Sequence, residues 1–359
     1  MRRLILLGVL VATMWGPAVA GAGWQEDWEQ TLKAAREEGK VTVTGPTGAH
    51  RRDALTQGFE KKYGIAVEYF AARGSAVAAR ISYERRAGQY LWDVMVGGAT
   101  TALTSMIPIG ALDPLEPDLI LPEVKKPENW RGGELQFVDS GREMFLMTLT
   151  QNDSLFVNSK LIEPKEITSY KDLLNPKWKG KIVADDPRRP GPGNSVFNFF
   201  DMHPDLGPDF IRALARQELL ILRDYQQELD MIGQGKYSIL IGTSASTAES
   251  WVQRGLPIAI VNPHDLKEGS DINPQAGAVA LMNRRPHPNA TKIYINWLLS
   301  KDGQTAFARA TGYISSRLDV PVDHAPWRVP IPGAIKTYTL EAMNNQKKLM
   351  RVLTEAFSR

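Results

Sequence analysis

The chain has 359 residues, with 43 Lys and Arg, 40 Asp and Glu and no cysteine. A chain of this length exceeds the size that one hydrophobic core usually supports, so we expect two domains. The absence of cysteine excludes disulfides, cysteine-ligated metals and a cysteine nucleophile, and the absence of long charged runs argues against a nucleic-acid partner.

Residues 1–20 have the order of a secretory signal peptide. Arg2 and Arg3 precede an apolar stretch that ends in Ala18-Val19-Ala20, which matches a charged region, an apolar region and a small-residue cleavage site. The apolar stretch is broken at Gly16-Pro17 and is short for a membrane span, although a membrane anchor is the alternative interpretation. We expect export to the periplasm and cleavage after Ala20.

Helical and extended patterns alternate in the first part of the mature chain. We expect helices at 24–40, 54–64, 75–88 and 100–110, and strands at 41–46, 65–72 and 92–98. Short loops between alternating strands and helices predict an α/β fold with a mostly parallel sheet covered by helices.

Each of these strands ends in small residues immediately before a helix. Ligands of parallel sheets bind beyond the carboxyl ends of the strands, where helix N-termini present backbone N–H groups to anions and polar ligands. Capping and tight turns explain any one of these sites alone, but three together favour ligand binding. The candidate residues are Gly45, Thr47, Gly48, Gly74, Ser75, Gly98, Ala99 and Thr100.

The second half repeats this alternation and suggests a second lobe. We expect strands within 179–193, at the start of 218–236, and at 237–242 and 256–263, with helices at 210–219, in the rest of 218–236 and at 246–255. The segments 143–162 and 276–284 are extended and predict two crossings between the lobes. We therefore assign 21–148 to lobe 1, 149–277 to lobe 2, and 278–359 to a return to lobe 1 with C-terminal helices.

Small hydroxyl residues follow the apolar run Ile239-Leu240-Ile241. Thr243, Ser244 and Ser246 are ligand-binding candidates because hydroxyl groups both donate and accept hydrogen bonds. Asp186 and Arg188 are candidates on the other side of the expected cleft, since arginine binds carboxylate and phosphate groups in bidentate fashion. The alternative for this second pair is a solvated loop with internal ion pairs.

The chain resembles the extracellular solute-binding proteins of ABC importers, of the type whose best-known members bind ferric iron. The resemblance is carried by FEKKYGIAVEY, ERRAGQYLWDVMVGG, SYKDLLNPKWKGKIVADDP, HPNATKIYINWLLSKDGQ and GYISSRLDV. It implies a two-lobed periplasmic-binding-protein fold of type II, each lobe a mixed, mostly parallel sheet flanked by helices. It also implies a ligand clamped by hinge closure between the lobes and delivered to a membrane permease.

The iron ligands of that type do not match this sequence. The resemblance places the family's tyrosine pair at about Ser244-Ala245 and a carboxylate ligand at about Gly98, whereas His50 lies only near a histidine ligand. We therefore expect a small polar or anionic solute, with no metal and no cofactor. Ferric iron held with a synergistic anion, or an iron chelate, is the alternative ligand.

An enzyme is the other class that this fold allows, because some transferases share it. The chain contains no HExxH, GxSxG, P-loop or GxGxxG motif, and its histidines are scattered singly, so we expect no catalytic residues and no turnover. We expect a monomer whose partner is a permease, with a membrane sensor as the alternative partner.

Overall fold

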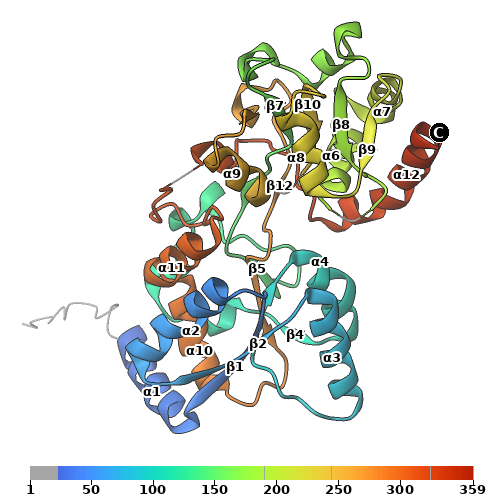
Figure 1. Cartoon of the computed structure of the whole chain (residues 1–359). Helices are drawn as coiled ribbons and strands as arrows, with labels where there is room; N and C mark the ends of the chain where they lie inside the picture. The colour runs from blue at the N-terminus through green and yellow to red at the C-terminus, as the bar shows by residue number, and fades with distance from the viewer. Residues whose placement is uncertain (1–22, 190, 244, 324, 359) are drawn as a thin grey trace, which may run out of the picture.

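The computed structural model describes residues 23–189, 191–243, 245–323 and 325–358, and the side chains of Ala245 and Ser246 are not described. The expected signal peptide lies outside these residues. The described chain forms two α/β lobes joined by extended segments (Figure 1). No helix among the described residues is long and apolar enough to cross a membrane.

Lobe 1 is built on a six-stranded mixed sheet in the order β2-β1-β3-β13-β4, with β5 also paired to β13. β1 runs parallel to β2 and β3, whereas β13 is antiparallel to β3. The strands are β1 (Lys40–Gly45), β2 (Ala66–Ala71), β3 (Val94–Gly97), β4 (Leu112–Asp113), β5 (Met144–Leu146) and β13 (Ala278–Met282). The helices are α1 (Gly23–Glu38), α2 (Ala49–Tyr63), α3 (Gly74–Arg86), α4 (Ala99–Thr101), α5 (Pro122–Lys125), α10 (Pro288–Leu299) and α11 (Lys301–Thr311).

The alternation of side chains along β3 produces two apolar layers in lobe 1. Val94 and Val96 pack with α1, α2 and α10, whereas Met95, between them, packs with α3 on the opposite face. Adjacent strand residues point to opposite faces of a sheet, so a sheet covered by helices on both faces requires the continuous apolar sequence seen here.

Two helical stretches of lobe 1 are interrupted. The stretch after Gly98 is a short α4 followed by a π-helix (Ala102–Met106) and a 3-10 turn (Ile107–Ile109), since Pro108 lacks a backbone N–H. The stretch 289–312 is two helices that meet at Ser300, whose side chain accepts a hydrogen bond from Gly303 N and caps α11.

Lobe 2 contains a five-stranded sheet in the order β11-β7-β10-β8-β9. The strands are β7 (Leu155–Asn158), β8 (Ile182–Asp185), β9 (Leu220–Leu222), β10 (Ile239–Ile241) and β11 (Ile258–Ile260), and the helices are α6 (Pro192–Met202), α7 (Gly207–Ala215), α8 (Tyr225–Gly233), α9 (Ala245–Gln253) and α12 (Leu340–Phe357). Ile239 and Ile241 pack with α6, α7 and α12, whereas Leu240 packs with α8 and α9. Short 3-10 turns lie at Glu116–Asp118, Pro127–Asn129, Arg131–Gly133, Pro164–Glu166, Tyr170–Leu174, Pro176–Trp178, Pro263–Asp265 and Pro326–Arg328.

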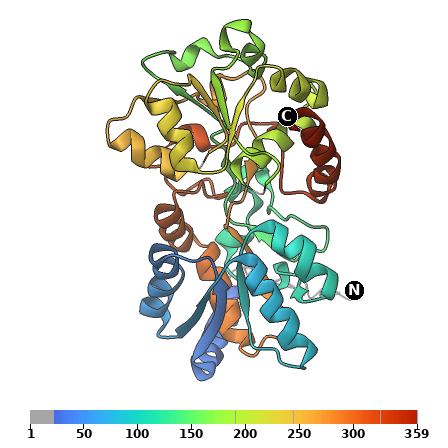
Figure 2. The same ribbon diagram turned by 45° about the vertical axis from the view of Figure 1, so that its right-hand side comes forward.

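The chain passes between the lobes three times rather than twice. β6 (Thr150–Gln151) lies in the first expected crossing and pairs as an antiparallel ribbon with β12 (Ile272–Asn273), which lies just before the second expected segment. That segment, 276–284, is mostly β13 of the lobe 1 sheet, so the second crossing begins earlier in the chain than expected. A third crossing leaves lobe 1 after α11 and leads to α12, which packs on lobe 2 through Leu349, Val352 and Leu353 (Figure 2). The C-terminal helix therefore belongs to the second lobe, while β13, α10 and α11 return to the first.

Candidate functional site

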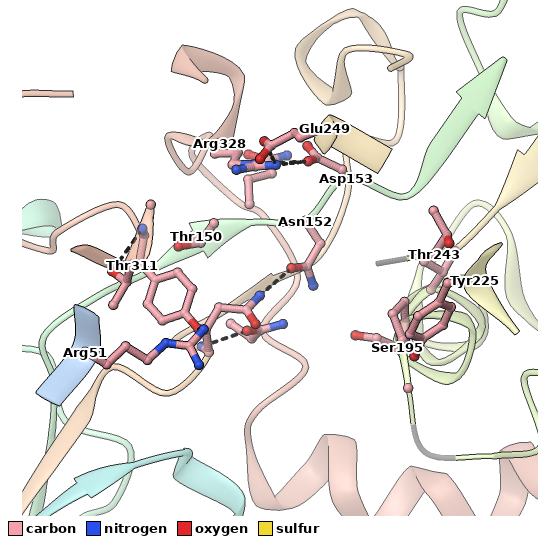
Figure 3. Close-up of a pocket in the computed structure, with 18 residues that line it drawn as sticks. Arg51, Thr150, Asn152, Asp153, Ser195, Tyr225, Thr243, Glu249, Thr311 and Arg328 are labelled. Atoms are coloured by element: carbon pink, nitrogen blue, oxygen red, sulfur yellow. Dashed lines mark hydrogen bonds and ion pairs between the residues drawn. The ribbon is translucent and has the colours of Figure 1, made fainter. Parts of the chain in front are cut away.

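A cavity of about 520 Å³ lies between the lobes and is lined by both lobes and all three crossings. In Figure 3, Ser195, Tyr225 and Thr243 of lobe 2 lie on one side of the cavity and Arg51 of lobe 1 lies on the other. The full lining is Arg51, Thr150, Gln151, Asn152, Asp153, Gly191, Pro192, Ser195, Val196, Tyr225, Thr243, Glu249, Asn273, Gln275, Thr311, Gly312, Tyr313 and Arg328. We call this cavity the cleft.

The two carboxylates of the cleft share one arginine. Arg328, on the third crossing, is 8% exposed and donates to Asp153 Oδ2 at 2.6 Å and to Glu249 Oε1 at 2.5 Å. Burial raises the pKa of Asp153, although Arg328 and a hydrogen bond from Trp327 Nε1 act in the opposite direction. This network ties the first crossing to the third crossing and to α9.

Arg51 is a cleft cation without an ion-pair partner among the described residues. It lies in the first turn of α2, and its guanidinium donates to Thr47 O at 3.2 Å and to Tyr313 Oη at 3.3 Å. Both acceptors are neutral, so these contacts orient the guanidinium without compensating its charge. Because Arg328 is shared by two carboxylates, Arg51 is the cation of the cleft that is available to a ligand.

Side-chain amides cover the floor of the cleft at the crossings. Gln275 Nε2 donates to Asn152 Oδ1 at 2.9 Å, and Asn152 Nδ2 donates to Asp271 Oδ2 at 2.7 Å. Gln151 is fully buried, and its Nε2 donor has no acceptor among the described residues. The Gln151 side chain is tied to the third crossing, where its Oε1 accepts a hydrogen bond from Ile331 N at 3.0 Å.

The lobe 2 wall of the cleft covers a buried pair of carboxyl groups. Glu228 of α8 is 0% exposed and lies next to the Thr243 hydroxyl and Asp185, whose Oδ2 accepts a hydrogen bond from Gly193 N at 2.8 Å. Burial raises the pKa of Glu228 to about 8, and neither oxygen of its carboxyl group has a hydrogen-bond partner among the described residues. Glu228 is therefore mostly uncharged at pH 7.

A second cavity, of about 250 Å³, lies at the carboxyl ends of the lobe 1 strands. We call it the lobe 1 pocket. Its lining is Pro46, Thr47, Ala72, Arg73, Gly74, Val77, Met95, Val96, Gly97, Gly98, Thr101 and Ala276. It occupies the edge of a sheet where ligands bind in open α/β folds.

The chain matches the family of bacterial extracellular solute-binding proteins over residues 54–330, which is most of its length. It belongs to this family. The family consists of binding proteins rather than enzymes, and its members act outside the cytoplasm as substrate-binding components of ABC transporters. The family and the function predicted from the sequence are thereby confirmed.

Three solved structures with low sequence identity share the fold. Mannheimia haemolytica ferric iron-binding protein A in an open conformation aligns with a TM-score of 0.66 and 17% identity, covering 88% of this chain and 98% of that one. A Trichodesmium protein in complex with iron and citrate has a TM-score of 0.64 and 15% identity, and the alignment covers 89% of this chain and 100% of that one. The periplasmic binding protein AfuA from Actinobacillus pleuropneumoniae, with fructose-6-phosphate bound, has a TM-score of 0.56 and 17% identity, covering 89% and 98%. The predicted type II periplasmic-binding-protein fold is confirmed.

The structure brings four of the predicted site residues of this solute-binding protein to the cavities. Thr47, Gly74 and Gly98 line the lobe 1 pocket, and Thr243 lines the cleft. The neighbouring candidates are not among the lining residues; these are Gly45, Gly48, Ser75, Ala99 and Thr100.

Gly45 has a structural role instead, because a Cβ atom there would collide with the Tyr69 ring. The Tyr69 hydroxyl donates to Pro46 O at 2.8 Å. Ser244 lies outside the described residues, and for Ser246 only the backbone, in α9, is described.

Asp186 and Arg188 do not line either cavity. Arg188 Nε donates to Asp186 Oδ1 at 2.8 Å, and Arg188 Nη1 donates to Phe357 O at the end of α12. Arg223 adds a second ion pair to Asp186 at 2.9 Å. Burial opposes ionisation of Asp186, but the hydrogen bonds from these arginines outweigh it and lower the pKa of its carboxyl group. The internal ion pairs left open as an alternative are therefore what the structure contains.

Sequence reasoning missed most of the cleft. The cleft residues that were missed come from helix α2 and the three crossings, which are far apart in the sequence. They are Arg51, Asn152, Gln275 and Arg328. The run of three polar residues Gln151-Asn152-Asp153, within a crossing that otherwise alternates apolar and polar residues, was the available signal. Polar residues in a segment that must lie between two lobes are exposed to the space that a ligand would fill.

Proposed function

We propose that this solute-binding protein captures a small organic anion, carboxylated or phosphorylated, in the cleft and delivers it to an ABC permease. The observation that carries the proposal is Arg51, a cleft guanidinium with no ion-pair partner among the described residues. Arginine binds carboxylate and phosphate groups through two parallel N–H donors. An anion that fills the cleft would supply the missing charge.

The other polar groups of the cleft suit the same ligand. Thr243, Ser195 and Tyr225 contribute hydroxyl groups to the lining. Asp153 and Glu249 are already paired with Arg328, so they repel an incoming anion less than free carboxylates would. Hydroxyl groups can donate hydrogen bonds to the acceptor oxygens of an organic anion.

Tyr225 of the cleft is poorly prepared to bind bare ferric iron. Burial, with the nearby Asp185 and Glu228, raises the pKa of Tyr225, which disfavours the phenolate form that ferric iron prefers. The described residues contain no group of three or more His, Asp and Glu side chains arranged to hold a metal. Two structural neighbours hold citrate with iron and fructose-6-phosphate, and both of these organic molecules are anions, whereas HitA from Pseudomonas aeruginosa is iron-bound.

We propose that the mature protein begins at Gly21, works in the periplasm as a monomer and performs no catalysis. The lobes close on the ligand through the crossings, because residues from both lobes line one cavity and a ligand that contacts both lobes selects the closed form. The partner of the closed form is the permease, which the protein contacts without nucleic acid or a cofactor.

A thermal-shift screen with four ligand groups tests this proposal. The groups are ferric salts, ferric citrate, phosphorylated sugars with phosphonates, and small carboxylates. We expect the largest stabilisation from an organic anion, with about 4 kcal/mol at a thousandfold excess over its dissociation constant. A larger shift from ferric ion alone, with a coloured phenolate charge-transfer band, would overturn the proposal. A larger shift from ferric citrate than from citrate would identify a chelate as the ligand.

A further inference from the structure

The lobe 1 pocket has an apolar floor, unlike the polar cleft. Val77, Met95 and Val96 line it, and each belongs to the hydrophobic core of lobe 1. Their exposed fractions are 4%, 2% and 3%, so all three are almost fully buried. Ala72 and Ala276 add two further methyl groups to the walls.

The lobe 1 pocket and the cleft are adjacent. Thr47 lines the pocket, and its carbonyl oxygen accepts the hydrogen bond from Arg51, which lines the cleft. On the opposite side, Gln275 lines the cleft and the next residue, Ala276, lines the pocket. One ligand can therefore contact Arg51 with one end and enter the pocket with the other.

Two glycines keep the pocket open, and the backbone does not require them. Gly97 and Gly98 both lie outside the left-handed region, and Gly98 has φ −83° and ψ 144°, a conformation that any residue adopts. A Cβ atom at Gly97 would meet nothing within 4 Å, and one at Gly98 would meet only Gln275 O, at 3.5 Å. These glycines differ from Gly74, where a Cβ atom would collide with Thr101. The space at 97–98 is thus unused by the fold itself.

We propose that the lobe 1 pocket is a subsite for an apolar, ring-sized group of the solute, so that the solute is an amphiphilic organic anion with its charged group at Arg51. This inference rests on the proposed function. The pocket of about 250 Å³ is large enough for such a group, since aliphatic cavities of about 150 Å³ bind benzene. Among the described residues, no carboxylate lines the pocket, and the one cation that does, Arg73, is exposed and forms no ion pair. These surroundings accept an anionic ligand.

Calorimetric titration with matched anions tests the subsite. The pairs are phenylphosphonate against methylphosphonate and benzylsuccinate against succinate, in which the charged group is constant and only the apolar group changes. We expect the aromatic member of at least one pair to bind roughly 10- to 70-fold more tightly, as burial of an aromatic ring predicts. Equal affinities within both pairs would overturn the subsite and leave the proposed function standing.

Two variants show whether the preference arises in the pocket. Gly97→Leu fills the pocket from β3, and Ala276→Leu fills it from the opposite wall if the first variant unfolds. Either variant should abolish the preference for the aromatic anions. Gly23→Leu is the control, because a Cβ atom at Gly23 also meets nothing within 4 Å but lies on α1, away from both cavities. A preference that survives pocket filling overturns the proposal.

A neutral probe separates this inference from the proposed function. Toluene, followed by NMR, should bind to the parent protein and to Arg51→Gln, but not to Gly97→Leu. If toluene binds and none of the anions does, the anionic part of the proposal fails while the apolar pocket stands. Toluene binding that is equal in the parent and Gly97→Leu contradicts the apolar subsite.

Discussion

Glu228 should make this protein less stable as the pH rises, and Glu228→Gln should weaken that dependence. Glu228 is fully buried in α8 against Asp185 and Thr243, and burial raises the pKa of its carboxyl group to about 8. The reference pKa of the group is 4.5. Between these two values the folded state holds a proton that the unfolded state releases, so the free energy of unfolding falls with increasing pH.

The magnitude follows from the size of this interval. Each unit of pKa difference corresponds to about 1.4 kcal/mol, so the full interval corresponds to about 5 kcal/mol between pH 4.5 and pH 8. Burial also raises the pKa of Asp185, which lies beside Glu228, so the titration is spread over both carboxyl groups. We therefore expect a loss of about 3 to 5 kcal/mol across this window.

Urea unfolding at several pH values between 5 and 9 measures this effect. Glu228→Gln keeps the shape of the side chain and cannot ionise, so its unfolding free energy should vary less with pH than that of the parent. At pH 8 it should exceed the value of the parent by about 3 kcal/mol. Glu37→Gln is the control, because Glu37 is exposed on α1. Parallel pH curves for the parent and Glu228→Gln would refute the assignment of a protonated carboxyl group behind the cleft.

Other consequences of the structure are open to direct measurement. Gly242→Ala should lose about 2 to 4 kcal/mol of unfolding free energy, because φ is 63° and a Cβ atom would lie 2.8 Å from Gly193 Cα. Gly180→Ala, where φ is 68° and a Cβ atom would meet nothing within 4 Å, should lose only about 1 kcal/mol. Equal losses in the two variants would contradict the close approach at Gly242. Arg328→Met should lose about 3 to 5 kcal/mol, since it leaves the buried Asp153 unpaired, and a parent-like urea midpoint would contradict that role. Small-angle scattering should show a smaller radius of gyration at ligand saturation, and an unchanged radius argues against closure. Mass spectrometry of the exported protein should find Gly21 as the first residue, and an intact Met1 in the membrane fraction would contradict cleavage.

The alternation of strands and helices allowed the lobes to be predicted from sequence. The apolar pattern of β1, β3 and β10 is local, and each strand ends close to its expected position. The third crossing was not predicted, because the apolar face of α12 shows that the helix is amphipathic but does not show which lobe it covers. Only the packed structure reveals that Leu349 and Leu353 lie in the core of lobe 2.

The candidate site was predictable only where it depends on strand ends. Thr47 and Gly98 were found because the carboxyl ends of parallel strands meet at one edge. Asp186 and Arg188 show the limit of that reasoning. A loop with an acidic and a basic residue has the same sequence pattern whether the two residues bind a ligand or form an ion pair with each other, as they do here. Arg51 and Arg328 are 277 positions apart and lie in the same cavity only because the lobes are joined three times.

Calorimetric titration of the best anion from the screen into the parent, Arg51→Gln and Arg52→Gln tests the central claim most directly. Arg52 neighbours Arg51 but is exposed and lines neither cavity, so it controls for the loss of one positive charge in α2. A hydrogen bond to a charged group contributes about 1.5 to 3 kcal/mol, so Arg51→Gln should weaken binding by roughly 10- to 150-fold while Arg52→Gln retains the affinity of the parent. Equal affinities for the parent and Arg51→Gln would show that the anion is not held in the cleft between the lobes.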